Sequence, residues 1–392
     1  MTAGAEETNF MQRRTWLIAA ASGATAAAFS FREHWFTQPA SLLQEATFHG
    51  PTHSVIPVVS DGKWIWKEPP IDQTGYLEPR SFETSIGLEL QGKGDAGSLR
   101  ATTPVPAEFP EQKIDKVEIL TDGCEARVQP LASGAAQLEM AATGIAKGQT
   151  IRAVAKMRLT LLKQYLGFAK EQFPAKQTLP TEIKKNYLQD SPGIQTSNGL
   201  VRKLGQEIAA EQKHPWDQAV AIAKWIRENI KPQIGTYTGV ATAMEKKRGD
   251  CEEMAAVFVA LARSLQIPAR LVWVPNHNWA EFYLTNEKGE GHWIPVHTAC
   301  YGWFGWTGAH ELVIQKGDRI VHPQKKNTQR LLEDWVQWQG VRPEIRFVGE
   351  LKPLPPDDSA SADPGPGGRR KEKSGAWKLT QEHPLDKYLR DV

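Results

Sequence analysis

Hydrophobic and polar residues alternate along the first part of the chain with the period of two that a half-buried β-strand requires. The alternation is clear over residues 82–90 and again over residues 151–161. Between them, two short apolar runs flank Thr121-Asp122-Gly123, a turn-forming tripeptide that predicts a β-hairpin. Several strands without helical periodicity favour two packed sheets. We therefore predict an all-β, sandwich-like domain over residues 46–165.

Beyond about residue 180 the spacing of apolar residues becomes that of amphipathic helices. Helices are predicted over residues 200–208, from Pro215 to the residue before Pro232, and from Cys251 onward. Three strand-like segments follow, at residues 271–274, 279–284 and 293–296, and the last two are joined as a hairpin. Helices followed by strands are typical of an α+β domain. We place this domain at residues 180–350.

The two ends of the chain differ in composition from these domains. Arg13-Arg14, followed by Trp16, Leu17 and an Ala-rich run, is typical of an export signal and resembles the bacterial twin-arginine signal. We assign residues 1–35 to this signal and expect an exported protein, in the periplasm or the cell envelope. Residues 353–392 are rich in Pro, Gly, Ser and charged residues, which predicts a disordered linker and tail.

Composition argues against several classes of function. The formal net charge is +2 and no basic stripe is present, so no nucleic-acid partner is expected. After the N-terminal signal no apolar run is long enough to cross a bilayer, so membrane contact would come only through an uncleaved signal. The cysteines Cys124, Cys251 and Cys300 are too few for a disulfide framework and lack the paired spacing of a structural zinc site. No cofactor is expected.

Cys251 is the cysteine in the setting best suited to chemistry. It begins a helix with an apolar stripe, and a thiol at a helix N-terminus beside an imidazolium becomes a reactive thiolate. His277 lies downstream at the start of a predicted strand, from which its ring could reach the thiol. Taken singly, a buried structural cysteine and a surface loop histidine are the commoner explanations. The pair therefore needs support from the residues around it.

Three motifs in order along the chain resemble one protein family. GDCEEMAAVFVALARSLQIPARLVW, starting at Gly249, resembles the nucleophile helix and the following strand of transglutaminase-like domains. HNWAEFYL, from His277, resembles the His-x-Trp-x-Glu strand of that family, and HWIPVHTA, from His292, resembles the strand that supplies the third member of its triad. The resemblance is strong over residues 249–298 and looser from about 200 to 320. It implies a papain-like α+β core preceded by the β domain, with Cys251 as nucleophile and His277 as general base and acid.

The third position departs from the family pattern, because His297 stands where the family has Asp. A neutral His297 could accept a hydrogen bond from the catalytic imidazole but could not supply a negative charge, and a protonated His297 would repel the imidazolium. Three hypotheses follow. The chain is an active enzyme with a Cys251-His277-His297 triad, or an inactive domain that binds a peptide or protein, or a protein that uses these three residues as ligands for a metal such as zinc.

The first hypothesis implies thiol-dependent acyl transfer at amide bonds. Water would resolve the acyl-enzyme in a protease or amidase, and an amine would resolve it in a transglutaminase. For an exported bacterial protein the resemblance favours hydrolysis, with a peptide, a protein or a cell-wall amide as substrate. The aromatic residues after the site are expected in the core rather than in a substrate groove; they are Trp303, Phe304, Trp306, Trp335 and Trp338. Cys300 is expected to be a buried free thiol, although a disulfide with Cys251 would block the site.

Overall fold

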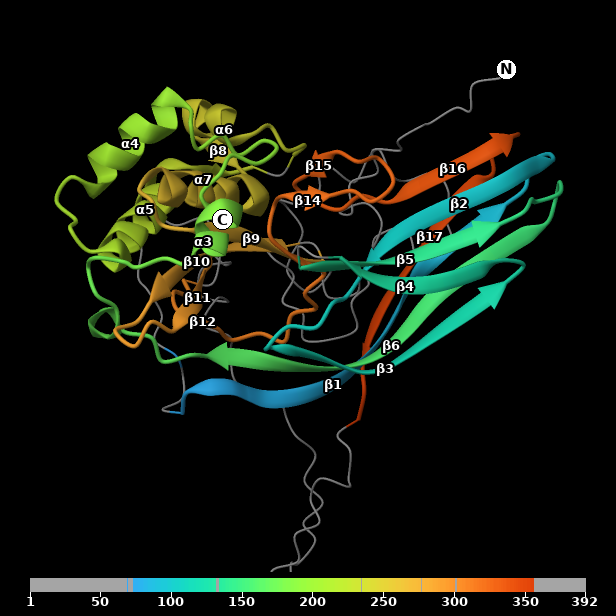
Figure 1. The fold of residues 1–392 in the computed structure, drawn as a ribbon, viewed down its shortest axis with the longest axis horizontal. Coiled ribbons are helices and arrows are strands. Elements are labelled where there is room, and N and C mark those ends of the chain that lie inside the picture. The colour runs from blue at the N-terminus through green and yellow to red at the C-terminus, as the bar shows by residue number, and fades with distance from the viewer. Residues whose placement is uncertain are drawn as a thin grey trace, which may run out of the picture. The chain divides into compact units, whose positions relative to one another are not determined.

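The computed structural model describes residues 69, 73–131, 134–233, 235–275, 277–299 and 302–355 (Figure 1). The predicted export signal at 1–35 lies outside these residues, and so does the predicted tail beyond residue 355. Residues 73–354 of the described part belong to one compact unit. None of the helices in the described ranges is both long and apolar enough to cross a membrane.

A five-stranded sheet is built on two long strands, β1 (Gly75–Gln91) and β6 (Thr150–Tyr165), which pair antiparallel. The strand order is β12-β6-β1-β17, and β3 also pairs with β6. The bounds of the other strands are Gln112–Asp122 for β3, Trp306–Thr307 for β12 and Glu344–Pro353 for β17. Alternate residues of β1 and β6, such as Leu88 and Leu159, are buried in the core that this sheet shares with the next one. This is the predicted period-two pattern.

An eight-stranded sheet has the order β11-β10-β9-β13-β5-β2-β16, with β4 paired to β5. Its strands are β2 (Ala96–Val105), β4 (Glu125–Leu131), β5 (Ala135–Ala142), β9 (Ala269–Val274), β10 (His277–Thr285), β11 (Gly291–Val296), β13 (Gln315–Lys316) and β16 (Trp335–Gly340). Gln315 of β13 pairs with Trp273 of β9 on one side and with Ala135 of β5 on the other. One sheet therefore runs through both predicted domains.

The last two strands lie inside or at the end of the range predicted for the α+β domain, 180–350, but they pair with the β domain. β16 pairs with β2, and β17 pairs with β1. The physical reason is that sheet pairing joins residues far apart in the sequence, and the local pattern of apolar residues carries no information about the partner strand. The chain enters the β region, leaves it for the α+β region and returns to complete both sheets.

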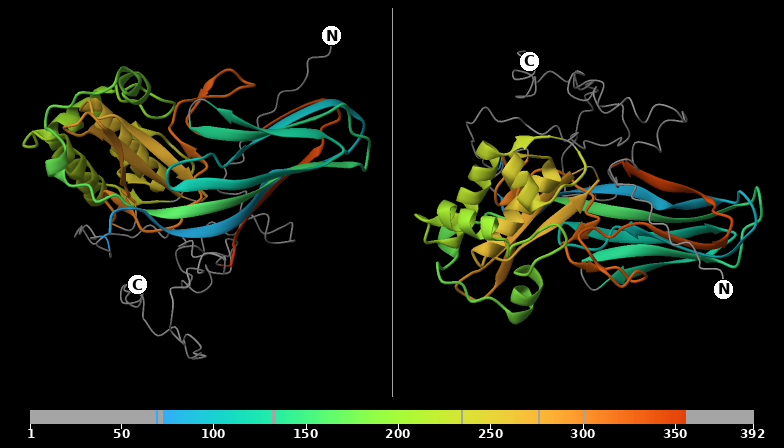
Figure 2. Two further views of the ribbon diagram at one scale, coloured as in Figure 1. Left: turned by 60° about the horizontal axis from the view of Figure 1, so that its bottom comes forward. Right: turned by 90° about the horizontal axis from the view of Figure 1, so that it is seen from above.

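Five α-helices are described in the ranges given above. Their bounds are Thr181–Tyr187 for α3, Gly199–Ala209 for α4, Pro215–Asn229 for α5, Val240–Lys246 for α6 and Cys251–Ser264 for α7, with a short 3₁₀ turn at Lys170–Gln172. Helix α7 packs against β9 and β10 and is in turn covered by α4, α5 and α6, as Figure 2 shows for the green-to-yellow helices beside the orange strands. The mixed α+β fold predicted from the sequence is confirmed.

The starts of the helices follow the expected local chemistry. Pro215 occupies the first turn of α5, where its missing N–H costs nothing, and the His214 side chain accepts the Trp216 N–H. Helix α7 is buried along its whole length from Cys251 to Arg263, so it is the central helix of the α+β region rather than an amphipathic surface helix.

Buried ion pairs fix the strands beside α7. The Arg263 guanidinium near the end of α7 donates to Asp318, and both side chains are fully buried. Glu281 in β10 pairs with Arg270 in β9 and with Lys316 in β13, and Lys316 also contacts Glu111, in the segment just before β3. Attraction to Arg270 and Lys316 outweighs burial and holds the pKa of Glu281 below its ordinary value. Glu281, the Glu of the His-x-Trp-x-Glu motif, thus has a structural role.

Two pairs of short strands complete the fold. β7 (Lys231–Pro232) pairs parallel with β8 (Arg248–Gly249), which leads directly into Cys251. β14 (Ile320–Val321) pairs with β15 (Thr328–Gln329). The first pair fixes the point at which the chain enters α7.

Candidate active site

Cys251 is the first residue of α7, and two reciprocal hydrogen bonds between side chain and backbone cap the start of this helix. The Asp250 side chain accepts the Glu252 N–H at 2.9 Å, and the Glu253 side chain accepts the Asp250 N–H at 3.0 Å. This is a capping box, which satisfies helix N–H groups that have no acceptor within the helix. Gly249 is required beside it, since a Cβ at that position would lie 2.5 Å from the Glu253 Cβ. Asp followed three residues later by Glu was a signal of this cap that the sequence interpretation left unused.

Three carboxylates surround the start of α7, and each is held by protein groups. Besides the two in the capping box, the Glu252 carboxylate pairs with Arg330 at 2.6 Å, and the Arg330 guanidinium lies 3.5 Å from the centroid of the Tyr237 ring. Glu253 also accepts the Thr238 N–H at 2.9 Å. These negative charges compensate the helix dipole. The cysteine at this helix start therefore depends on other groups to stabilise its thiolate.

The Cys251 thiol contacts the strand that carries the candidate histidine. Its Sγ donates to Asn278 Oδ1 at 3.6 Å, and Asn278 is the residue next to His277 in β10. Cys251 is 7% exposed, His277 3% and Asn278 4%. Asn278 pairs with Trp273 of β9, whose side chain lies in the core that includes α7. Since paired residues of neighbouring strands share a face, the Asn278 side chain is directed at the helix. The structure thus places the predicted nucleophile beside the predicted His strand.

His277 and His297 come together at the neighbouring ends of β10 and β11. Their ring centroids are 5.8 Å apart, with 20° between the ring planes. The Trp279 ring lies 5.0 Å from the His297 ring and nearly parallel to it, and Trp303 meets His297 edge-on at 5.1 Å. On its other side, His297 Nε2 is 3.2 Å from the hydroxyl oxygen of Thr307. His297 is therefore held by aromatic rings and one hydroxyl, with its ring facing His277.

The burial of His297 and the charges near it determine its protonation state. Complete burial, and secondarily the adjacent His277, lower the pKa of His297 well below 6.5. His297 is consequently neutral at physiological pH. It has the capacity to accept or donate a hydrogen bond, according to its tautomer, but it brings no negative charge to His277. The repulsive form considered for the third position does not arise.

The aromatic residues that follow the site are largely core, as expected. Trp303 and Trp306 pack on each other, and Trp335 and Trp338 are buried in β16. Phe304 is half-buried against Trp216 at 5.2 Å. Trp303 meets the His297 ring, so it helps to hold His297. Cys300 lies outside the described residues.

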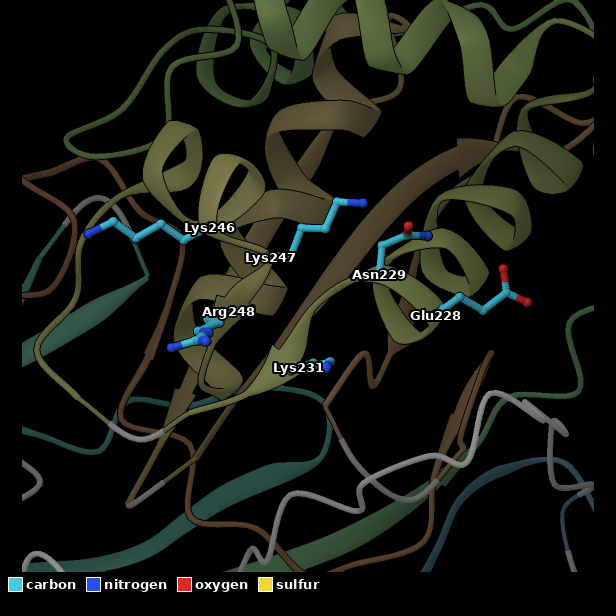
Figure 3. A pocket seen from close by; sticks show the side chains of 6 residues that line it. All are labelled: Glu228, Asn229, Lys231, Lys246, Lys247 and Arg248. Atoms are coloured by element: carbon cyan, nitrogen blue, oxygen red, sulfur yellow. The ribbon is translucent and has the colours of Figure 1, made fainter.

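The metal hypothesis finds no support in the described ranges. No group of three or more His, Cys, Asp or Glu residues there is arranged to hold a metal ion, so Cys251, His277 and His297 do not form such a set. A basic concavity of about 320 Å³ lies at β7 and β8 (Figure 3). Its lining residues are Glu228, Asn229, Lys231, Lys246, Lys247 and Arg248. None of these is a candidate catalytic residue.

Comparison with known proteins points to one superfamily. Residues 202–298 match the model of the transglutaminase-like superfamily, and Cys251, His277 and His297 all lie within that range. Over 118 residues the chain is 25% identical to peptide-N(4)-(N-acetyl-beta-glucosaminyl)asparagine amidase of Yarrowia lipolytica. Over 96 residues it is 29% identical to an uncharacterized protein of Haemophilus influenzae.

These alignments cover limited parts of the proteins concerned. The alignment with the Yarrowia amidase covers 29% of this chain and 32% of the relative, and that with the Haemophilus protein covers 23% and 26%. The chain thus spans about a third and a quarter of the relatives' lengths. Among solved structures, a candidate cysteine protease from Cytophaga hutchinsonii aligns with a TM-score of 0.49 and 15% identity, covering 71% of this chain and 99% of that one.

Proposed function

Because residues 202–298 match the model of the transglutaminase-like superfamily, we propose that the chain performs thiol-dependent acyl transfer at an amide bond, with Cys251 as the nucleophile. The observation that carries the proposal is the position of Cys251. It is the first residue of a buried helix, in contact with the residue beside His277, and it lies within the matched range. Nucleophilic attack also needs a base within reach of the thiol, and His277, at the start of the strand that Sγ contacts, is the residue we propose for that role.

The first half of the reaction forms a thioester. His277 takes the proton of the Cys251 thiol, and Sγ then bonds to the carbonyl carbon of the substrate while the carbonyl π electrons move to oxygen. The tetrahedral intermediate collapses when the electron pair on oxygen re-forms the carbonyl. The C–N bond breaks, and the departing nitrogen takes the proton from His277. An amine leaves, and the acyl group stays on Cys251.

The second half transfers the acyl group to water. His277 removes a proton from a water molecule, the oxygen bonds to the acyl carbon, and the thioester C–S bond breaks as Cys251 recovers its proton. The products are a carboxylic acid and the free enzyme. We favour water over an amine acceptor, and a peptide, protein or cell-wall amide as the substrate. Support comes from the amidase named among the relatives and from the export signal expected at residues 1–35.

In the proposed mechanism His297, the third member of the triad, acts as a neutral side chain. Neutral His297 lies against His277 and orients it, and its own orientation is fixed by Thr307 and Trp279. Without a carboxylate, the Cys251 thiolate–His277 imidazolium pair is less stabilised than in a triad that includes Asp. The proposed enzyme is therefore slower than one with the full family triad, and it works best where His277 is neutral before attack.

The rival function is a protein- or peptide-binding module that keeps the fold and has lost catalysis. The observations that favour it are the altered third position and the three carboxylates at the start of α7. The two functions differ in one measurable property, the nucleophilicity of Cys251. A binding module has no need of a thiol that reacts below the ordinary pKa of cysteine, about 8.5.

The test is the rate of alkylation of each cysteine by iodoacetamide between about pH 5 and pH 9, measured by peptide mass spectrometry. Cys124 is an internal control, because burial raises the pKa of its thiol and its Sγ donates to the Arg152 carbonyl oxygen. We expect Cys251 to react at mildly acidic pH, Cys124 to react only at alkaline pH, and His277→Ala to slow Cys251 alone. Equal pH profiles for the two cysteines would refute the proposal in favour of the binding module.

The proposed location outside the cytoplasm rests on residues 1–35. Fractionation of bacterial cells expressing the full chain tests it. We expect the protein in the periplasmic fraction, with Arg13→Lys plus Arg14→Lys retained in the cytoplasm. Native protein found entirely in the cytoplasm would contradict the proposed location and leave the proposed chemistry unaffected.

A further inference from the structure

Asn278, the second residue of β10, has an unusual environment for an asparagine. It is 4% exposed, and its Oδ1 lies 3.6 Å from Cys251 Sγ. Its Nδ2 is buried without a hydrogen-bond partner among the described residues. A buried amide donor left unsatisfied destabilises the folded state. The contacts of the resting fold do not explain this donor beside a candidate nucleophile. A role during the reaction would explain it.

Acyl transfer at Cys251 needs hydrogen-bond donors for the negatively charged oxygen of the tetrahedral intermediate. Most backbone N–H groups at the start of α7 are already engaged in the helix cap. The capping box takes the N–H groups of Glu252 and Glu253, and the Met254 N–H bonds to the Asp250 carbonyl oxygen. These N–H groups are committed to the helix cap, whereas oxyanion sites commonly present two or more donors.

From the buried, unpartnered Nδ2 and its place beside Cys251 Sγ we propose that the Asn278 carboxamide is the side-chain donor of the oxyanion site and thus a catalytic residue. The inference rests on the function proposed above, because it assigns a role in the same reaction. In the resting protein Oδ1 accepts the Cys251 S–H. Once the thiol has lost its proton, a half-turn of the carboxamide about its terminal torsion presents Nδ2 to the site instead, and the two orientations occupy nearly the same volume.

The distance suits this role. The oxygen of a tetrahedral intermediate lies on the carbon bonded to Sγ, so it occupies space next to the sulfur that the carboxamide already contacts at 3.6 Å. An oxyanion donor is effective at about 2.7–3.1 Å from the charged oxygen, a separation that a group in contact with the sulfur can reach. The donor is also neutral, which matters because Asp250, Glu252 and Glu253 already crowd negative charge around the helix start.

No atom is transferred to or from Asn278 in the proposed step. Nδ2–H donates to the oxygen while the carbonyl π electrons reside there, and the hydrogen bond weakens when the carbonyl re-forms and the C–N bond breaks. The donor therefore stabilises the transition state more than the bound substrate. Its removal is expected to lower kcat with little change in KM.

The experiment compares Asn278→Ala and Asn278→Asp with the native protein and with Thr285→Val. Thr285 is an equally buried polar residue at the far end of the same strand, so its variant controls for the loss of a buried polar group in β10. The substrate is p-nitrophenyl acetate, and the readouts are the acylation rate of Cys251, kcat and KM. Circular dichroism and thermal melting report whether each variant is folded. The pH profile of iodoacetamide alkylation provides a second readout that needs no turnover.

We expect Asn278→Ala to lower kcat on the order of a hundredfold to a thousandfold with KM nearly constant, as for the loss of one oxyanion donor. Asn278→Asp should lose more, because it removes the donor and adds a negative charge, and Thr285→Val should match the native rate. Native-like acylation by folded Asn278→Ala would overturn the inference and leave the proposed function intact. A lower pH for the onset of alkylation in Asn278→Ala, together with native-like acylation, would show that Asn278 acts only as the acceptor of the thiol proton. No acylation of native Cys251 would overturn the proposed function itself, and the role of Asn278 with it.

Discussion

Replacement of His297 tests whether a charge at the third triad position would stabilise the Cys251–His277 ion pair. The distances in the structure give the size of the expected stabilisation. His297→Asp would place a carboxylate where a neutral ring now lies, 5.8 Å from the centre of the His277 ring. Two unit charges at that distance attract by about 3 kcal/mol at an effective dielectric constant of about 20, which corresponds to about a hundredfold in an equilibrium constant. The thiolate–imidazolium form of the Cys251–His277 pair should become more populated by up to this factor.

Burial opposes this gain. The site that lowers the pKa of His297 by desolvation would penalise a carboxylate as well, so about a hundredfold is an upper limit. The Thr307 hydroxyl, now 3.2 Å from His297 Nε2, is the donor available to a carboxylate there. Loss of the Trp279 and Trp303 ring contacts should lower the melting temperature of the variant.

The assay is the pH profile of Cys251 alkylation together with turnover of p-nitrophenyl acetate, for His297→Asp, His297→Asn and His297→Phe. Asp should shift the alkylation profile to lower pH and raise turnover. Asn retains a neutral acceptor and should resemble the native protein, while Phe retains the packing but removes the polar contact and should lower turnover. If Asp and Asn give the same profile in folded protein, charge at position 297 does not act on the Cys251–His277 pair and the reasoning fails.

Two further predictions concern the fold that holds the site. Asp318→Asn should lower the free energy of unfolding by about 3–5 kcal/mol in urea, because it leaves the fully buried Arg263 without its counter-ion; a loss below about 1 kcal/mol would contradict this account. For His322, burial lowers the pKa to about 4, and its Nδ1 accepts the N–H groups of Gln324 and Lys325 in the neutral form. Because the unfolded chain binds this proton near pH 6.5 and the folded chain does not, its contribution is complete above pH 6.5 and is lost as pH falls toward about 4. Folded His322→Asn should flatten the pH dependence of stability in that window, and an unchanged slope would show that other groups set it.

The sequence contained most of what positions the nucleophile. Apolar periodicity after Cys251 and the proline at position 215 are local signals, and the helices α5 and α7 begin where those signals lie. The strand from His277 and its hairpin partner are local as well, because the loop between them is short. Such features were predictable because neighbouring residues alone determine them.

What the sequence could not supply came from contacts between distant segments. Gln315 connects β5 to β9, and β16 and β17 return to the first sheets, through pairings with no local signature. The neutrality of His297 depends on burial by rings from β10 and from the segment after β11. Asn278 was overlooked because its position in the motif carries no expected chemistry, and only the direction of its side chain toward Cys251 gives it a role.

The measurement that tests the central claim most directly is the mass of the native chain, quenched in acid within seconds of mixing with p-nitrophenyl acetate or with a pool of acylated peptides. The account predicts one added acyl group, mapped to Cys251, absent from Cys251→Ser and released on longer incubation with native protein. An unmodified Cys251 in folded, reduced protein, or an adduct that persists equally in Cys251→Ser, would contradict it.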